Sequence, residues 1–341
     1  MNQKVSDRIK ILGFFMTCFM VFYHCGSVGN SNTFGAFDAS CNSFLNYIFN
    51  TMGMVVMSHF FAVTGFLLFY HLNMKNYSSK IKRRVFSLLI PYVMWQIIIA
   101  IKYVLQNEYT FSIKNFIYRT FYLVTWPIDG PMWYVYAIFL LALISPVFLL
   151  MFKNKKVGWC MVLIIIVFLR AQGKFNIPVF TRIANHGYVG NIIWYFPSYL
   201  VGAFYGRFYD ELNEEKSLVY VLSLLFLACL LQGVLPGIFY DITIRMMPIM
   251  SLFLLPVIPS LKDKWVYRLT FLMYAMHQPL IADVKPHINN LYKVVLMPDS
   301  VRNILTRVII LAIDIALAAA IYIVLKKFAP KGLNALTGSR D

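Results

Sequence analysis

Long runs of apolar residues constrain the fold of this chain more than any other feature of its sequence. A helix needs about 20 mainly apolar residues to cross a bilayer, and such runs recur from residue 9 to residue 325. Because lipid offers no partner to free backbone groups, such runs must fold as helices. We therefore predict an all-α transmembrane bundle of about ten spans, at residues 9–25, 53–72, 85–105, 133–152, 157–169, 192–205, 218–239, 243–258, 269–284 and 304–325.

The composition agrees with a membrane location. Hydrophobic residues make up 60% of the chain and charged residues only 13%, whereas a soluble domain carries about 25% charged residues. No small-residue cleavage site follows the first apolar run, so we interpret that run as a retained anchor. We expect a multi-pass protein of the cell membrane, of the bacterial plasma-membrane type. We expect one transmembrane domain at residues 1–330 and a short cytoplasmic tail at residues 331–341.

The basic residues indicate the orientation of the chain. The formal net charge is +17, and the Lys and Arg residues flank the apolar runs, which is the positive-inside pattern and not that of a nucleic-acid-binding protein. Residues 26–52 contain no Lys or Arg. We therefore predict cytoplasmic termini and an external loop at residues 26–52.

Residues 112–124, and more weakly residues 44–50, resemble helices that lie in the headgroup layer.

The five cysteines show no metal-ligand spacing. Cys25 and Cys41 flank the first external loop and could form a disulfide in an oxidising compartment. The alternative is that all five are unpaired apolar residues.

One face of the first predicted helix carries groups that could take part in chemistry. At 100° per residue, Lys10, Gly13, Thr17 and His24 lie within about 40° of one line along the helix. His24 lies at the outer end, roughly 21 Å from Lys10. A neutral imidazole there could take a proton from a sugar hydroxyl or orient it. The alternative is an interfacial histidine that only meets water.

Five further segments follow His24 in a set order. They are FFAVTGF at residues 60–66, KRR at 82–84 followed by Pro91-Tyr92, GPMWY at 130–134, WYFPSYLVGAFYGR at 194–207 and LMYAMHQP at 272–279. Together with His24, they resemble acyltransferase family 3, the ten-helix membrane O-acyltransferases that modify surface polysaccharides. The resemblance covers almost the whole chain. It departs from the family at Gly13, where the family usually has Arg, and Lys10 or Arg8 could substitute for it.

The resemblance implies an acyltransferase that transfers groups other than amino-acyl groups. The expected reaction is O-acetylation of a cell-surface polysaccharide or glycan precursor, with an acyl-coenzyme A, chiefly acetyl-coenzyme A, as donor and His24 as general base. No tightly bound cofactor and no metal are expected. The expected partners are membrane lipid, the carbohydrate acceptor and the donor.

Other residues are candidates for contact with substrate or donor. They are Lys10, Thr17, Thr64, Lys82, Arg83, Arg84, Trp133 and His277. The basic residues suit the phosphates of coenzyme A, but positive-inside topology would produce the same cluster. Thr64 and Trp133 could instead serve helix packing or an interfacial belt. His277 could instead stabilise the helix end before Pro279.

Two other functions remain open. Arg245 and Asp314 are isolated charges in apolar runs, which suits a transporter or flippase. We find no inverted repeat of the kind that many transporters show. The chain could also be a non-catalytic partner in polysaccharide assembly.

Overall fold

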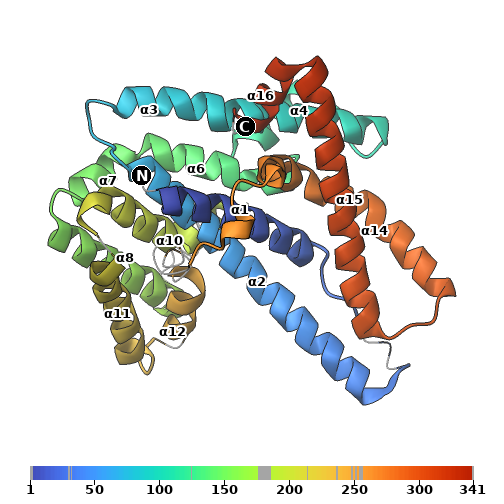
Figure 1. Cartoon of the computed structure of the whole chain (residues 1–341), viewed down its shortest axis with the longest axis horizontal. Helices are drawn as coiled ribbons and strands as arrows, with labels where there is room; N and C mark the ends of the chain where they lie inside the picture. The colour runs from blue at the N-terminus through green and yellow to red at the C-terminus, as the bar shows by residue number, and fades with distance from the viewer. Residues whose placement is uncertain are drawn as a thin grey trace. The chain divides into compact units, whose positions relative to one another are not determined.

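Helices are the regular elements throughout the part of the chain that the structure describes. The computed structural model describes residues 3–29, 31, 33–123, 125–175, 186–212, 214–235, 237–246, 249, 252 and 256–339. Within these residues no strand occurs, so the all-α prediction is confirmed. All five cysteines are unpaired. Figure 1 shows the helices in chain order by colour.

The chain is divided into two compact units, each made of two separate segments. The first unit contains Met1–Ile9 and Met57–Lys262, and the second contains Lys10–Val56 and Asp263–Asp341. Two of the three boundaries fall inside a helix, one within α1 (Gln3–His24) and one within α2 (Gly35–Phe69), and the third lies between Lys262 and Asp263. At the first two boundaries the chain therefore passes from one unit to the other within a continuous helix.

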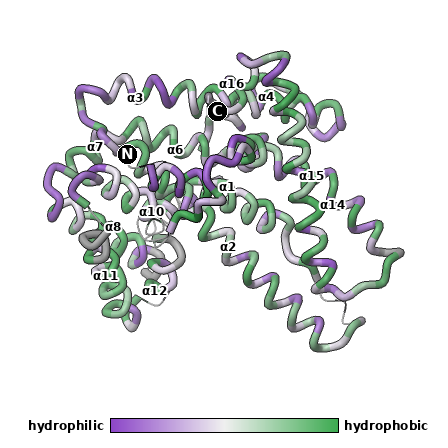
Figure 2. Tube along the Cα trace, in the orientation of Figure 1, coloured by the Kyte–Doolittle hydropathy of each residue, from purple (hydrophilic) through white to green (hydrophobic). Residues whose placement is uncertain are grey.

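Three described stretches are long and apolar enough to cross a bilayer. They are α2, the continuous stretch Tyr77–Leu105, and α15 (Asp299–Phe328). A fourth candidate is a pair of helices, Gly130–Leu143 and Ser145–Met151, that meet at 56°. Figure 2 shows the apolar residues along most of α15 and the hydrophilic residues along α3 (Tyr77–Arg84). A membrane protein is supported, whereas ten spans and cytoplasmic termini stay predictions.

The first unit contains the middle of the chain. After α3, its elements are η1 (Val85–Leu89), α4 (Ile90–Leu105), α5 (Ile113–Phe121), η2 (Gly130–Met132), α6 (Trp133–Leu143), α7 (Ser145–Met151), α8 (Lys155–Phe175), α10 (Val189–Arg207), η3 (Tyr209–Glu211), α11 (Glu214–Leu231), α12 (Ile238–Asp241), η4 (Ile242–Met246) and η6 (Pro259–Leu261). Residues 247–248, 250–251 and 253–255 of the eighth expected span, 243–258, and the side chain of Arg245 lie outside the described residues.

Glycines bring α2 and α10 close together in the first unit. A Cβ atom on Gly202 would lie 1.9 Å from the Ala62 carbonyl oxygen, and one on Gly206 would lie 2.2 Å from that of Phe66. From the other side, a Cβ on Gly65 would lie 2.3 Å from the Tyr199 carbonyl oxygen. Small residues at this spacing permit backbone contact between membrane helices. The motif FFAVTGF therefore has a packing role.

The basic motif KRR lies at the end of a helix. Lys82, Arg83 and Arg84 form the last turn of α3, which continues through the π-helical turn η1 into α4. Pro91 explains the wide turn, because its ring would clash with the carbonyl four residues earlier in a regular helix. Similarly, Pro146 lies at the start of α7, where the chain bends away from α6.

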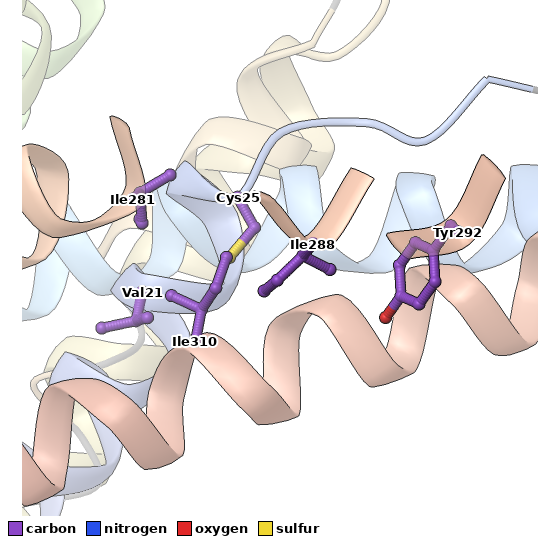
Figure 3. Close-up of a cluster of buried hydrophobic side chains, with 6 residues drawn as sticks. All are labelled: Val21, Cys25, Ile281, Ile288, Tyr292 and Ile310. Carbon is purple, nitrogen blue, oxygen red and sulfur yellow. The ribbon is translucent and has the colours of Figure 1, made fainter. Parts of the chain in front are cut away.

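The second unit packs α1 against two later helices. Besides parts of α1 and α2, it contains η7 (Trp265–Leu269), α14 (Thr270–Val294), α15 and α16 (Pro330–Thr337). Its apolar cluster combines side chains from α1, the residue after it, α14 and α15, namely Val21, Cys25, Ile281, Ile288, Tyr292 and Ile310 (Figure 3). In Figure 1, α14 and α15 lie side by side. The cluster fixes the end of α1 between them.

Polar contacts tie the start of α2 to the start of α15. The carboxylate of Asp38 accepts hydrogen bonds from the backbone N–H groups of Asp299 and Ser300, at 2.8 and 3.1 Å. A carboxylate at a helix N-terminus satisfies free N–H groups and complements the helix dipole. One turn later, the Asn303 amide donates to the side-chain oxygens of Asn42 and Asn46, at 2.5 and 2.8 Å.

Two segments, expected to be a loop and a tail, contain helices in the structure, and a third segment, expected to be an interfacial helix, forms a helix. Helix α2 begins at Gly35, so it includes most of the expected loop 26–52 and all of residues 44–50. Its length follows from the contacts with α15 that hold its first turns. The expected tail begins with helix α16, in which Leu333 and Thr337 are buried. The segment expected at residues 112–124 does form a short amphipathic helix, α5, in which Thr120 is the buried residue; residue 124 lies outside the described residues.

Candidate active site

His24 is the last residue of α1 and is half-buried. The helix ends there because Gly26 adopts a left-handed conformation, with φ of +71°, and donates its N–H to the Tyr23 carbonyl at 3.0 Å. Glycine tolerates this conformation because it has no Cβ atom. Because of this turn, His24 is the last residue of the helix, and its ring is only partly buried.

Two cations hold the carbonyl groups at this helix end. The Arg307 guanidinium donates to the carbonyl oxygens of Phe22 and Gly26, at 3.1 and 2.7 Å. The Lys285 ammonium donates to the carbonyl of Cys25. Arg307 is only 1% exposed, and its guanidinium lies 4.2 Å from the centre of the Phe49 ring. Cations are favoured at helix C-termini, where carbonyls have no partner within the helix. Arg307 and Lys285 therefore fix the backbone on both sides of His24.

Helix α14 brings two side chains against His24. The Gln278 amide nitrogen lies 2.9 Å from His24 Nδ1. The ring of His277 lies 4.9 Å from the His24 ring, centre to centre, at an angle of 49°. His277 is fully buried, and its Nδ1 lies 2.6 Å from the Tyr274 carbonyl oxygen. His24 therefore contacts two residues, His277 and Gln278, that lie more than 250 positions away in the sequence.

This arrangement suits proton transfer with a hydroxyl group. An imidazole that is partly exposed can meet a substrate, and a buried partner can orient it. We did not assign a role to Gln278 from the sequence, and nothing in the sequence signalled its contact with His24. Arg307 did have a signal that we overlooked, since it is a charged residue within the apolar run of the last helix.

Lys10 and Thr17 do not join His24. The Lys10 ammonium lies 4.0 Å from the carboxylate of Asp263, and both side chains are exposed. The Thr17 hydroxyl is buried and donates to the carbonyl of Gly13 at 3.0 Å. Arg8, which belongs to the first unit, donates to the Leu252 carbonyl at 2.8 Å. A Cβ atom at Gly13 would meet no atom within 4 Å.

The first unit contains the other candidate residues. The Tyr134 hydroxyl donates to the Phe60 carbonyl at 2.9 Å, which leaves the Thr64 hydroxyl to donate to Tyr134 at 2.6 Å. Trp133 is 8% exposed and its ring lies 6.0 Å from those of both Phe61 and Tyr188. In this structure Thr64 and Trp133 therefore have contacts within the helix packing.

The basic residues of α3 take different positions. Lys82 and Arg83 are exposed, whereas Arg84 is half-buried. The guanidinium of Arg84 lies within electrostatic range of the Tyr134 and Tyr199 hydroxyls. It therefore lies near the hydroxyl chain that includes Thr64. The Arg84 guanidinium is a planar cation of the kind that binds phosphate.

A family comparison covers nearly the whole chain. Residues 8–323 match the family model described as an acyltransferase domain. The chain belongs to acyltransferase family 3. No curated protein and no solved structure matches it. The resemblance that the motifs indicated is therefore confirmed, and a membrane acyltransferase-type function is supported for this family 3 protein.

Proposed function

We propose that this family 3 protein transfers an acyl group, in the first instance acetyl from acetyl-coenzyme A, to a hydroxyl group of a cell-surface polysaccharide or glycan precursor. The observation that carries the proposal is the His24 ring, partly buried at a helix end and in contact with His277 and Gln278, in a chain that belongs to an acyltransferase family. We further propose a multi-pass location in a bacterial plasma membrane.

In the proposed reaction His24 acts as general base. A hydroxyl group is a weak nucleophile until its proton is removed as it attacks. The acceptor oxygen attacks the thioester carbonyl carbon, the carbon–sulfur bond breaks, and the proton passes through His24 to the leaving thiolate. Arg307 and Lys285 contribute indirectly, because they hold the carbonyls around His24.

The basic residues of α3 are the proposed contacts for the donor. Arg84 is half-buried, and Lys82 and Arg83 are exposed where they can meet a large anion. With cytoplasmic termini, α3 would face the compartment in which acyl-coenzyme A is made. Lys10 and Thr17 have weaker support as substrate contacts, since other groups in the protein already occupy their polar atoms.

Replacing His24 tests the proposal. We expect His24→Gln to insert normally and to lose acylation by about 10²- to 10⁴-fold, which is the contribution of a typical general base. Mass analysis of the surface glycan from cells that express each variant measures the loss. His287→Gln is the matched control, because His287 is exposed on α14. Full acylation in the His24 variant would remove this residue from the mechanism.

A carrier is the second candidate function, and one observation favours it. Asp314 lies midway along α15, is fully buried, and neither carboxylate oxygen has a hydrogen-bond partner among the described residues. Buried carboxylates in membrane helices often mark ion or substrate pathways. Binding of acetyl-coenzyme A to the purified protein separates the two functions. If no acyl-coenzyme A binds, the carrier becomes the better assignment.

A further inference from the structure

The contact between His24 and Gln278 determines which nitrogen of His24 carries the proton. The amide nitrogen of Gln278 lies 2.9 Å from His24 Nδ1. An amide N–H₂ group can only donate, so Nδ1 is the acceptor. A neutral imidazole with an acceptor at Nδ1 carries its hydrogen on Nε2. His24 is therefore the Nε2–H tautomer.

His277 has the opposite tautomer. Its Nδ1 lies 2.6 Å from the Tyr274 carbonyl oxygen, which can only accept, so Nδ1 carries the hydrogen. The lone pair is then on Nε2. This nitrogen is buried and has no hydrogen-bond partner in the described part of the chain. A buried acceptor without a donor is costly, so the site favours a donor that can reach it.

His24 is the donor within reach. The two ring centres are 4.9 Å apart. When two imidazoles share an N–H···N bond of about 2.9 Å, their centres are roughly 5 Å apart. A rotation of the His24 ring about its Cβ–Cγ bond can therefore aim Nε2–H at His277 Nε2 without backbone movement. The same rotation withdraws Nδ1 from the Gln278 amide and frees its lone pair.

We propose that His24 takes the acceptor's proton on Nδ1, and that His277 is the positioning residue that holds the His24 proton on Nε2. This inference rests on the proposed acyl transfer. The acceptor O–H takes the place of the Gln278 N–H at Nδ1. As the acceptor oxygen bonds to the acyl carbon, its proton moves to Nδ1, the carbon–sulfur bond breaks, and the imidazolium returns the proton to the thiolate of coenzyme A. His277 accepts the Nε2–H bond throughout and stabilises the charged ring, without touching substrate.

Nuclear magnetic resonance tests the tautomers without any turnover. In protein labelled with ¹⁵N-histidine, protonated and bare ring nitrogens have distinct chemical shifts, and spectra of the His24→Gln and His277→Gln variants assign the signals. We expect His24 to carry its hydrogen on Nε2 and His277 on Nδ1. A hydrogen on Nδ1 of neutral His24 would overturn the proposal, whatever the enzymatic activity.

Kinetics of acetyl transfer then test the role of His277. We expect His277→Leu to lower kcat about 100-fold, as loss of an orienting partner does elsewhere, with the KM for acetyl-coenzyme A nearly unchanged. His277→Gln should recover part of the loss, because its amide oxygen can still accept the Nε2–H bond. His287→Gln is again the control and should match the wild type. An unchanged kcat in His277→Leu, or a glutamine variant as slow as the leucine variant, would overturn the role of His277. If the wild-type protein itself transfers no acyl group, the proposed function fails, and the ¹⁵N spectra still decide the tautomers.

Discussion

At the residue scale, the candidate chemistry depends on which polar atoms are already engaged. The His24 ring is partly buried and contacts Gln278, whereas the Thr17 hydroxyl donates to a carbonyl of its own helix and Lys10 lies beside Asp263. Gly13 lies on the same helix face as His24 but offers no side chain at all. Of the four positions on that face, His24 is therefore the one that we propose for the chemistry.

Restoring the family's arginine at residue 13 tests whether the missing cation limits the reaction. We expect Gly13→Arg to insert normally, because a Cβ atom there meets nothing within 4 Å, and because glycine within a helix costs about 0.5–1 kcal/mol relative to alanine. We expect about a tenfold gain in kcat/KM, since a charge-assisted hydrogen bond contributes about 1.5 kcal/mol or more. Initial rates of acetyl transfer measure the gain, with Gly13→Ala as the control. A loss of activity in the arginine variant alone would show that this protein has adapted to glycine.

Arg84 allows a second test at this scale. We expect Arg84→Gln to weaken acetyl-coenzyme A binding by about tenfold, because a half-buried guanidinium binds phosphate more strongly than an exposed one does. Isothermal titration of the purified protein measures the affinity. Arg83→Gln, at an exposed neighbour in the same turn, is the matched comparison and should have a smaller effect. If wild type and Arg84→Gln bound acetyl-coenzyme A with equal affinity, the basic motif would serve only to orient the chain in the membrane.

At the element scale, the two units are held together internally by different kinds of contact. In the first unit, backbone approaches between α2 and α10 depend on Gly202, Gly206 and Gly65. In the second unit, an apolar cluster, the buried Arg307 and the partly buried Lys285 hold the end of α1 against α14 and α15. The first arrangement requires small residues, and the second requires long ones that reach a neighbouring helix.

The glycine contact predicts a strong effect from a single methyl group. We expect Gly202→Ala to destabilise the protein by about 1–3 kcal/mol, the usual cost of overpacking, because its Cβ atom would lie 1.9 Å from the Ala62 carbonyl oxygen. Thermal unfolding in detergent, followed by circular dichroism, would show a lower Tm. Gly233→Ala is the control, since a Cβ atom there meets nothing within 4 Å. Equal Tm values for the two variants would mean that α2 and α10 do not approach as described.

At the scale of the whole molecule, the orientation in the membrane remains to be tested. The distribution of Lys and Arg predicts cytoplasmic termini and an external location for residues 26–52. In the structure most of this region is helical, because α2 begins at Gly35. The prediction of its side rests on the absence of Lys and Arg and does not depend on whether the region is a loop or a helix. Three or four described stretches satisfy the length and apolarity of a span, so the other spans that we predict would have to consist of shorter or bent helices.

Cysteine labelling determines the orientation. In a variant without the five native cysteines, we expect Ser27→Cys to react with a membrane-impermeant maleimide in intact cells, because Ser27 is exposed in the segment that we place outside. Lys153→Cys, at an exposed residue that we place inside, should react only after the cells are opened. The reverse pattern would invert the topology and with it the proposed side of donor entry.

The sequence alone determined the fold class and the family. Apolar runs too long for a soluble core require helices, and the ordered motifs from His24 to His277 identified acyltransferase family 3, because both signals are local in the chain. It could not determine that α2 extends back to Gly35, since that extension depends on polar contacts with α15.

Only the tertiary structure decided which residues accompany His24. Gln278, Lys285 and Arg307 come from helices more than 250 residues further along the chain, and the periodicity of a single helix contains no information about such neighbours. Likewise, helical periodicity placed Lys10 and Thr17 on one face with His24 but did not indicate the partners of these side chains. A face specifies a direction, whereas the packing of other helices determines which polar atoms remain free to react.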